Sequence, residues 1–240
     1  MVAIYTVFPG RDIMEKSYQK VVQYVKNEII NGNLKQGDRL VSERELAEIL
    51  DTSRNSVREG LRTLENLGIL ASQHGSGNYI SSNFNKTVSE LLSFMYLLQG
   101  ISDDQITEFR LAIEWEAMQL AVHRVYEEEK ESLRLHMEAL EAADNEEERV
   151  YHDKSIHIGL VAASHNEILI TNYDAINSLM DNYIKSMRAK IISGMQNKGS
   201  LMRTHRMLVE GILENDLDKG LQGLRDHFGY IDQYKGEVLI

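Results

Sequence analysis

Apolar residues recur at helical spacing along nearly the whole chain, and this periodicity constrains the fold more than any other feature of the sequence. After residue 83 it continues to the carboxy-terminal end in about seven stripes, with no strand-like alternation between them. The stripes cover residues 88–98, 106–122, 133–140, 150–163, 168–192, 201–213 and 217–234. Residues 83–240 are therefore predicted to form an all-helical domain without a sheet.

Three further helices are expected in the amino-terminal third of the chain. The first covers residues 16–30, where apolar residues again follow helical spacing. Ser42 and Glu45 have the spacing of a capping box, which starts a second, short helix. The third helix begins at Ser53 and ends at Gly68, since glycine readily takes the left-handed conformation that closes a helix.

The stretch 71–80 differs from the rest because it reads as a strand, a glycine turn and a second strand. Two helices across a tight turn followed by such a hairpin are typical of a winged helix-turn-helix. A chain of 240 residues has room for two domains at roughly 100 to 200 residues each. The sequence thus predicts a mainly α protein, with a winged helix-turn-helix domain at residues 1–82 and a helical domain at residues 83–240.

The composition restricts the chemistry and the location of the protein. The chain contains no cysteine, so disulfides and thiolate metal sites are excluded, and any metal must be bound by His, Asp or Glu. No run approaches the roughly 18 consecutive apolar residues that span a bilayer, and the amino terminus lacks the pattern of a signal peptide. We expect a cytoplasmic protein with no membrane partner.

The net charge of -11 is unevenly distributed along the chain. Residues 1–82 contain ten basic and ten acidic residues, so the whole negative charge belongs to residues 83–240. Because an acidic domain is repelled by phosphate, contact with DNA must come from a local cluster of arginines in the neutral part of the chain.

Such a cluster lies at the starts of two predicted helices. Arg54, Asn55 and Arg58 lie at the start of the third helix, on the face away from its leucines, and Arg44 lies in the first turn of the second. Arginines on a helix usually form a solvated face that pairs with acidic neighbours. Their concentration at two helix starts, followed by a glycine hairpin, favours contact with phosphates and base edges instead.

Four potential metal ligands lie on the apolar faces of three predicted helices. Asp153 and His157 are four residues apart and therefore share a face, while His205 and His227 each interrupt an apolar stripe. A single histidine on such a face is more often a hydrogen-bonded core residue than a ligand. A carboxylate with three imidazoles, however, suits a divalent ion, with zinc, nickel, manganese and iron as candidates, and leaves positions open for water or a ligand carboxylate.

Arg110 also interrupts an apolar stripe, and Glu114 follows it one turn later. A buried arginine needs a partner. Two interpretations stay open: an ion pair within the helix between Arg110 and Glu114, or a clamp in which Arg110 binds an anionic ligand beside the metal. Both can hold, with Glu114 orienting Arg110.

Three segments in the amino-terminal third together resemble the GntR family of transcription regulators. They are residues 37–47 (GDRLVSERELA), 53–61 (SRNSVREGL) and 75–80 (GSGNYI), in the order and spacing of the family. The sequence departs from the family at Val41, where proline is usual, and at Gly60, where alanine is more common and glycine costs the helix up to about 1 kcal/mol.

The resemblance implies that the two helix starts contact DNA and that the hairpin is a wing at the minor groove. The residues expected at the DNA are Arg44, Ser53, Arg54, Asn55, Arg58, His74, Gly75 and Gly77. It also implies a homodimer, which agrees with physical reasoning, because two related heads read a palindromic operator with far greater discrimination than one.

The second domain resembles the FCD ligand-binding domain of the FadR-type subfamily. The resemblance rests on the order and spacing of Arg110 and Glu114, Asp153 and His157, then His205 and His227. It implies an antiparallel helical bundle in which the last four of these residues hold a metal, with Arg110 and Glu114 at a small carboxylate effector. The helix expected at 88–98 favours the subgroup with an extra helix after the wing.

These features together predict a metabolite-responsive transcription regulator, with repression as the default sign, and not an enzyme. Two alternatives stay open. One is a metalloenzyme, which would use the open metal positions to activate water but would need a general base near the metal. The other is a regulator whose metal is purely structural or is itself the signal.

Overall fold

The computed structural model describes residues 17–73, 76–81, 84–194 and 199–234. The chain divides into two compact units, one ending at Thr87 and the other beginning at Val88. The domain boundary predicted between residues 82 and 83 falls on two residues outside the described part of the chain.

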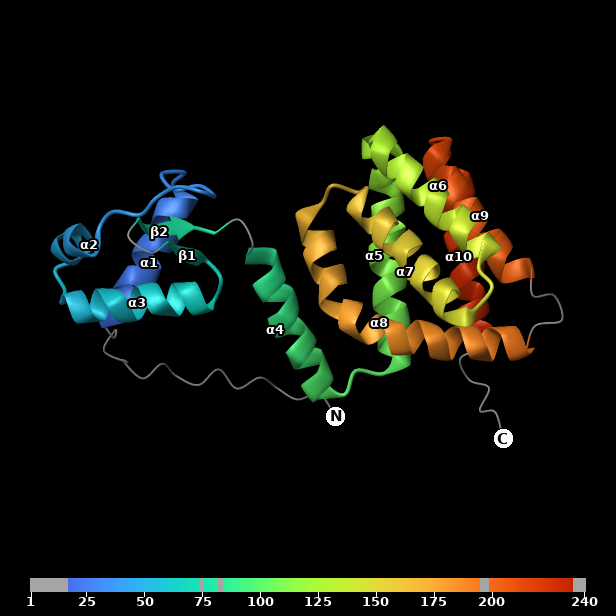
Figure 1. Ribbon diagram of the computed structural model, residues 1–240, viewed down its shortest axis with the longest axis horizontal. Coiled ribbons are helices and arrows are strands. Elements are labelled where there is room, and N and C mark those ends of the chain that lie inside the picture. Colours follow the sequence, from blue (N-terminus) through green and yellow to red (C-terminus); the bar gives the residue numbers. More distant parts are fainter. Residues whose placement is uncertain (1–16, 74–75, 82–83, 195–198, 235–240) are drawn as a thin grey trace, which may run out of the picture. The chain divides into compact units, whose positions relative to one another are not determined.

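The first unit contains three helices and one hairpin. They are α1 (Ser17–Ile30), α2 (Glu43–Ile49), α3 (Arg54–Asn66), β1 (Leu70–Gln73) and β2 (Gly77–Ile80). The two strands pair antiparallel, with Leu70 opposite Ile80 (Figure 1). This is the winged helix-turn-helix that the sequence predicts, and the prediction is confirmed.

Local hydrogen bonds explain where α2 and α3 begin and end. The Ser42 hydroxyl accepts from the Glu45 backbone N–H, and the Glu45 carboxylate accepts from the Ser42 backbone N–H, which completes a capping box. Ser53 caps α3 by accepting from the Ser56 backbone N–H. Gly68, with a φ of 71°, takes the left-handed conformation just after α3.

Gly60 lets α1 approach α3 more closely than any other residue would. A Cβ atom at this position would lie 2.6 Å from the Cβ of Val21 and 2.8 Å from the carbonyl oxygen of Tyr18. The sequence shows only the cost of glycine to helix propensity, whereas the structure shows what the missing side chain permits. Around this contact lies the core of the unit, formed by Val21, Val25, Leu40, Leu46, Val57, Leu61, Leu64, Leu70 and Ile80.

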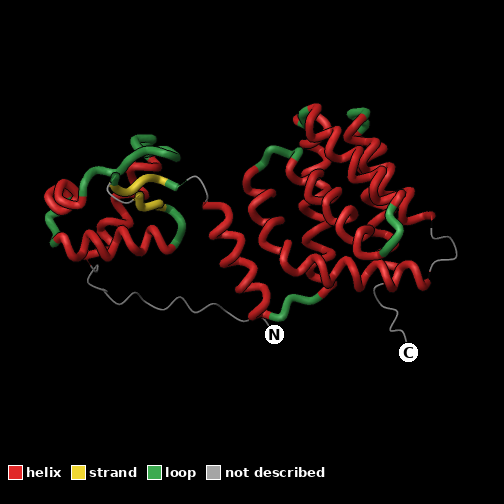
Figure 2. Tube along the Cα trace, viewed as in Figure 1, coloured by secondary structure: helices red, strands yellow, loops and turns green. Residues whose placement is uncertain are grey.

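The remaining helices coincide with the seven apolar stripes of the sequence. They are α4 (Phe84–Gln99), α5 (Asp103–Arg124), α6 (Glu127–Ala142), α7 (Glu146–Ala162), α8 (Glu167–Gly194), α9 (Gly199–Leu213) and α10 (Leu217–Tyr234). Within the described residues the two strands are confined to the first unit, and the second consists of helices and loops (Figure 2). None of the described helices is long and apolar enough to cross a membrane.

In the second unit α5 contacts α7, α8, α9 and α10 and so lies at the centre of the helical bundle. The helices α9 and α10 run antiparallel after a short loop and approach closely through glycines. A Cβ at Gly211 would lie 2.5 Å from the Cα of Gly220, and a Cβ at Gly223 would lie 2.7 Å from the backbone nitrogen of Leu208. These contacts hold two histidine-bearing helices at short distance.

The interior of the second unit is apolar except for a group of buried polar side chains. Of the described residues, those that are buried and polar or charged all lie in this unit: Thr107, Arg110, Glu114, Asp153, His157, Ser164, Arg188, Thr204, His205 and His227. Burial of charge is costly unless the charge is paired or binds a metal. Most of these residues meet in one place, which is the candidate site.

Candidate functional site

Three buried imidazoles from three helices face one another in the bundle. His157 of α7, His205 of α9 and His227 of α10 each offer a ring nitrogen, and these three atoms lie within 4.8 Å of one another. The ring centroids are 4.7 to 5.4 Å apart. The structure therefore brings together the three histidines that the sequence predicts as metal ligands.

Hydrogen bonds fix the tautomer of two of these rings. The Nδ1 of His157 lies 2.6 Å from Oε2 of Glu114, and the Nδ1 of His205 lies 3.0 Å from the carbonyl oxygen of Leu201. An ionised carboxylate and a carbonyl oxygen can only accept, so each Nδ1 donates its proton, and in the neutral form of each ring Nε2 keeps the lone pair. Both Nε2 atoms are buried and have no hydrogen-bond partner among the described residues.

His227 differs from the other two because neither of its ring nitrogens has a hydrogen-bond partner in the part of the chain that the structure describes. Burial, together with the neighbouring imidazoles of His205 and His157, holds the pKa of His227 well below its ordinary value. Burial also lowers the pKa of His157. Neutral rings with free lone pairs are the form in which histidine binds a metal.

Asp153 completes the donor set from the preceding turn of α7. Its Oδ1 lies 3.7 Å from Nε2 of His157, and its Oδ2 lies 3.2 Å from Nε2 of His205. Burial opposes ionisation of Asp153, but His205, His157 and Arg188 hold its pKa well below its ordinary value, so the carboxylate is ionised. Three imidazoles and one carboxylate are a donor set that divalent transition metals prefer. The residues therefore fit a metal ion, and the hydrogen bonds to Glu114 and Leu201 are the outer contacts that orient such ligands.

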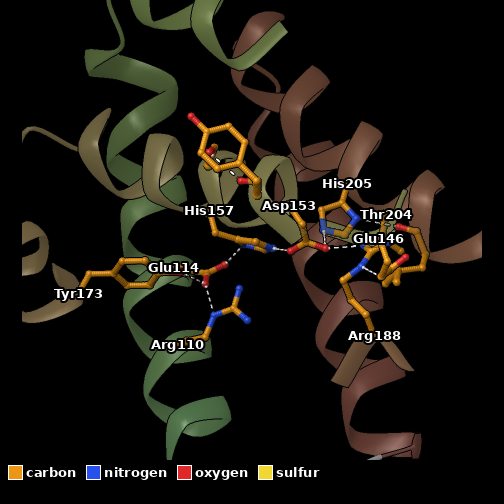
Figure 3. Close-up of polar contacts among 12 residues, drawn as sticks. Arg110, Glu114, Glu146, Asp153, His157, Tyr173, Arg188, Thr204 and His205 are labelled. Atoms are coloured by element: carbon orange, nitrogen blue, oxygen red, sulfur yellow. Dashed lines mark hydrogen bonds and ion pairs between the residues drawn. The ribbon is translucent and has the colours of Figure 1, made fainter. Parts of the chain in front are cut away.

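Arg110 and Glu114 of α5 form a fully buried ion pair beside the histidines. The Nε of Arg110 donates to Oε1 of Glu114 at 2.9 Å, and the hydroxyl of Tyr173 donates to the same oxygen at 2.7 Å (Figure 3). Burial opposes ionisation of Glu114, but Arg110 and the hydrogen bonds from His157 and Tyr173 lower its pKa to about 2. The intrahelical pair considered from the sequence is thus present.

The same arginine keeps one donor for another partner. The Nη2 of Arg110 is buried and unpartnered among the described residues, although the guanidinium carries a full charge. Arg110 and His227 line one cavity with Asp153 and Tyr183, and its volume of ≈10 Å³ holds about one water molecule. Any larger ligand must therefore move side chains to enter.

A second arginine at this cavity, Arg188, was not predicted from the sequence. Arg188 of α8 donates from Nη1 to Oδ2 of Asp153 at 2.8 Å and from Nε to Oε1 of Glu146 at 2.6 Å. The sequence contains a signal for this residue, because Arg188 interrupts the apolar stripe of α8 between Ile184 and Ile191. Arg110 interrupts the stripe of α5 in the same way. Figure 3 shows these contacts as one continuous row from Tyr173 through Glu114, His157 and Asp153 to Arg188 and Glu146.

In the first unit, the predicted DNA-contacting arginines are exposed at the starts of α2 and α3. Arg44 lies 3.7 Å from Glu48, and the Nε of Arg58 lies 2.8 Å from Oε2 of Glu43. Exposed ion pairs contribute only about 0 to 1 kcal/mol, so both guanidinium groups can exchange these partners for phosphate. Arg54 and Asn55 form the exposed first turn of α3.

The other predicted DNA residues have different surroundings. Ser53 serves as the cap of α3, so its hydroxyl is engaged with the helix, and its contact with DNA stays a prediction. Gly77 begins β2 with a φ of 106°, where only glycine is unstrained, and a Cβ there would lie 3.3 Å from the guanidinium of Arg39. His74 and Gly75 lie outside the described residues.

Comparison with known proteins agrees with both halves of this description. Residues 17–80 match the model of the bacterial regulatory proteins of the gntR family, and residues 105–230 match that of the FCD domain. The HTH-type transcriptional regulator LutR of Bacillus subtilis (strain 168) is 32% identical over 155 residues, which cover 63% of this chain and 70% of that protein. The Glc operon transcriptional activator of Escherichia coli (strain K12) is 26% identical over 213 residues, 86% of this chain and 84% of the relative.

A solved structure shows the same fold at lower identity. Streptococcus agalactiae GntR is 20% identical and superposes with a TM-score of 0.56, covering 90% of this chain and 99% of that one. The two family models lie in the order of the two units of the structure, and together they cover most of the chain. The chain belongs to the GntR family of bacterial regulatory proteins, with an FCD domain after its winged helix-turn-helix, and is a DNA-binding transcription regulator and not an enzyme.

Proposed function

We propose that this protein is a homodimeric, cytoplasmic repressor whose affinity for operator DNA is controlled by a small carboxylate. The carboxylate binds beside a divalent metal held by Asp153, His157, His205 and His227. Zinc is the first candidate, and nickel, manganese and iron are the others, because nitrogen and oxygen donors of this kind suit all four.

One observation is the main support for a bound metal. The unpartnered nitrogens of His157, His205 and His227 are buried and face one another, with no hydrogen-bond donor between them among the described residues. Polar atoms in such a position lose their hydration without any compensation. A bound cation removes this cost, and the metal when bound also supplies open positions for an oxygen ligand.

We infer from the state of Arg110 that the effector is a carboxylate. Its Nη2 is buried without a partner, while its Nε is fixed by Glu114. A guanidinium in this state suits an anionic oxygen, because charge-assisted hydrogen bonds are stronger than neutral ones. Glu114 in turn accepts from His157, so it couples the anion-binding arginine to the metal-binding histidine.

The DNA contacts are proposed for the exposed starts of α2 and α3 and for the wing. The residues are Arg44, Ser53, Arg54, Asn55, Arg58, His74, Gly75 and Gly77. Two such heads in a dimer would read the two halves of a palindrome. One relative is named a transcriptional activator, so repression or activation by this protein is tested directly by transcription from a reporter promoter with the effector present and absent.

The first test is the metal content of the purified protein, with His227→Ala as the variant and His123→Ala as the control. His123 is exposed on α5, away from the buried set. We expect close to one metal ion per chain in the wild type and in His123→Ala, and a large loss in His227→Ala. Thermal-shift screening with small mono-, di- and hydroxycarboxylates then follows, because a ligand stabilises the state to which it binds.

The possible results of this test differ clearly. A carboxylate that raises the melting temperature only in metal-loaded protein supports the effector proposal. A protein that is stabilised by metal alone and ignores all carboxylates would instead be a regulator with a structural or sensed metal. Equal metal content in the wild type and in His227→Ala would contradict the site itself.

A further inference from the structure

The cavity beside the histidines is lined by two arginines from two different helices. Arg110 reaches it from α5 and Arg188 from α8, and the side chains of both are almost completely buried. Arg110 is the group that the proposed function assigns to the first carboxylate. The second arginine therefore requires its own explanation.

The charges of the buried groups suggest a reason for the second arginine. The buried ionised groups are Arg110 and Arg188, which are positive, and Glu114 and Asp153, which are negative, so their charges cancel. Imidazoles that bind a metal are neutral. A divalent metal among them therefore leaves a net charge of about two positive units in a dry interior, where uncompensated charge is costly. Glu146 at Arg188 offsets one of these units in the ligand-free protein, so a ligand that displaces Glu146 must bring two carboxylates to offset both.

Arg188 also has a partner that a ligand can replace. Asp153 holds its Nη1 inside the bundle, whereas Glu146 holds its Nε from the outside. The side chain of Glu146 is 43% exposed and that of Arg188 only 7%. Glu146 also lies 3.7 Å from Arg149, a second cation that can retain its carboxylate. Glu146 is therefore the partner that Arg188 can lose at lower cost.

Glu146 also lies at the surface of the protein, on the side of Arg188 away from the cavity lining. It lines a surface groove of ≈800 Å³ between α7 and α8, with Lys154, Asn177 and Lys185 among the other lining residues. Arg188 lines the inner cavity, so the ion pair between Arg188 and Glu146 joins the groove to that cavity. Because the cavity is too small for an organic ligand, entry requires this contact or a similar one to open.

We propose that Arg188 binds a second carboxylate of the effector, which is therefore a small dicarboxylate, and that Glu146 occupies this subsite in the ligand-free protein. The inference rests on the proposed function, in which the first carboxylate lies at the metal and Arg110. On binding, the distal carboxylate of the ligand replaces Glu146 at Arg188, while Asp153 stays in place.

The test is calorimetric titration of the metal-loaded, full-length protein with ligands that differ by one carboxylate. Propionate serves as the monocarboxylate, and malonate, succinate and glutarate as dicarboxylates of increasing length. We expect one dicarboxylate to bind at least about tenfold more tightly than propionate, because only a dicarboxylate places a second anionic group at Arg188.

Variants assign that preference to the proposed residues. Arg188→Gln should abolish the preference for the dicarboxylate, measured in metal-loaded protein as the ratio of its affinity to that of propionate. Glu146→Gln should strengthen dicarboxylate binding severalfold and leave propionate unaffected. Glu147→Gln is the matched control, because Glu147 lines the same groove but forms no ion pair with Arg188 in the described structure.

Each contrary result has a separate meaning. If Arg188→Gln weakens propionate and the dicarboxylate equally, or loses the metal, Arg188 only positions Asp153 and the inference is wrong. If propionate binds as tightly as every dicarboxylate, the inference is also wrong, although the proposed function stands. If no carboxylate binds the metal-loaded wild type, the proposed function itself fails. If Arg188→Gln does not fold, the ligand preference of the wild type and the ligand affinities of Glu146→Gln still test the inference.

Discussion

Glu114 is the residue that connects the two chemical parts of the candidate site. One of its oxygens accepts from Arg110 and Tyr173, and the other lies 2.6 Å from His157. It therefore orients an arginine suited to an anion and fixes the tautomer of a histidine suited to a metal. A change of position at either neighbour reaches the other through one rigid, fully buried carboxylate.

The substitution Glu114→Gln tests this role. It leaves the charge of Arg110 buried without a counter-charge, so we expect a loss of about 3 to 5 kcal/mol in the free energy of unfolding. Trp115, the only tryptophan of the chain, reports the unfolding of this unit by fluorescence in urea. Glu131→Gln breaks an exposed pair with Arg134 and should cost no more than about 1 kcal/mol. Equal losses in the two variants would show that Glu114 does not stabilise Arg110.

At this scale the sequence reveals some site residues and hides others. Arg110, His205 and His227 are visible because each interrupts an apolar stripe, and Arg188 carries the same signal on α8. Tyr173 gives no such signal, since an aromatic residue on an apolar face reads as core. Its hydroxyl finds Glu114 only because α8 packs beside α5, which is a tertiary fact.

At the scale of elements, the distance between α9 and α10 sets the distance between two of the histidines. His205 and His227 have ring centroids 4.7 Å apart because glycines let the two backbones meet. The position of Gly223 admits no Cβ, since the obstructing atoms belong to the backbone of α9 and cannot rotate away.

Gly223→Ala should therefore separate α9 from α10. We expect a loss of about 1 to 3 kcal/mol in stability and a metal affinity lower by about tenfold or more. Gly229→Ala is the matched control, because it changes the same helix at a site with nothing within 4 Å of the added Cβ. The control should keep its metal affinity and gain up to about 1 kcal/mol from helix propensity. Equal metal affinity in the two variants would rule out the spacing argument.

Gly60→Ala tests whether the close contact between α1 and α3 also requires a glycine. Alanine gains up to about 1 kcal/mol in helix propensity, but its Cβ meets Val21 and the backbone of Tyr18, and such overpacking costs about 1 to 3 kcal/mol. We expect faster hydrogen exchange in α1 and α3. Glu59→Ala, at the exposed neighbouring position, should stay within about 0.5 kcal/mol of the wild type. Unchanged exchange in Gly60→Ala would show that α1 can shift to admit the methyl group.

Helix positions were predictable because apolar periodicity records which face of each element is buried, and the stripes in residues 88–234 each correspond to one helix. The packing partner of each helix was not predictable, since periodicity shows which face of a helix is buried but not which element covers that face. Gly60 shows the limit well. Read along the sequence it is a weak point of α3, and only the position of α1 makes it a packing requirement.

At the scale of the whole molecule, charge and function are divided between the two units. The chain carries a net charge of -11, while residues 1–82 are neutral overall. We therefore expect DNA binding to depend on a few exposed arginines at the helix starts and not on a general positive field. Loss of one such arginine should be visible in the salt dependence of binding.

Arg54→Gln tests both the DNA contact and the dimer in one measurement. On a duplex of arbitrary sequence, binding is electrostatic, and the logarithm of the association constant falls with the logarithm of salt by about 0.9 per phosphate contact. The proposed homodimer would lose the contact twice, so the slope should decrease by about 1.8. Arg206→Gln, an exposed arginine of α9 paired with Glu141, should leave the slope unchanged. A decrease near 0.9 would mean that only one head binds, and no decrease would remove Arg54 from the interface.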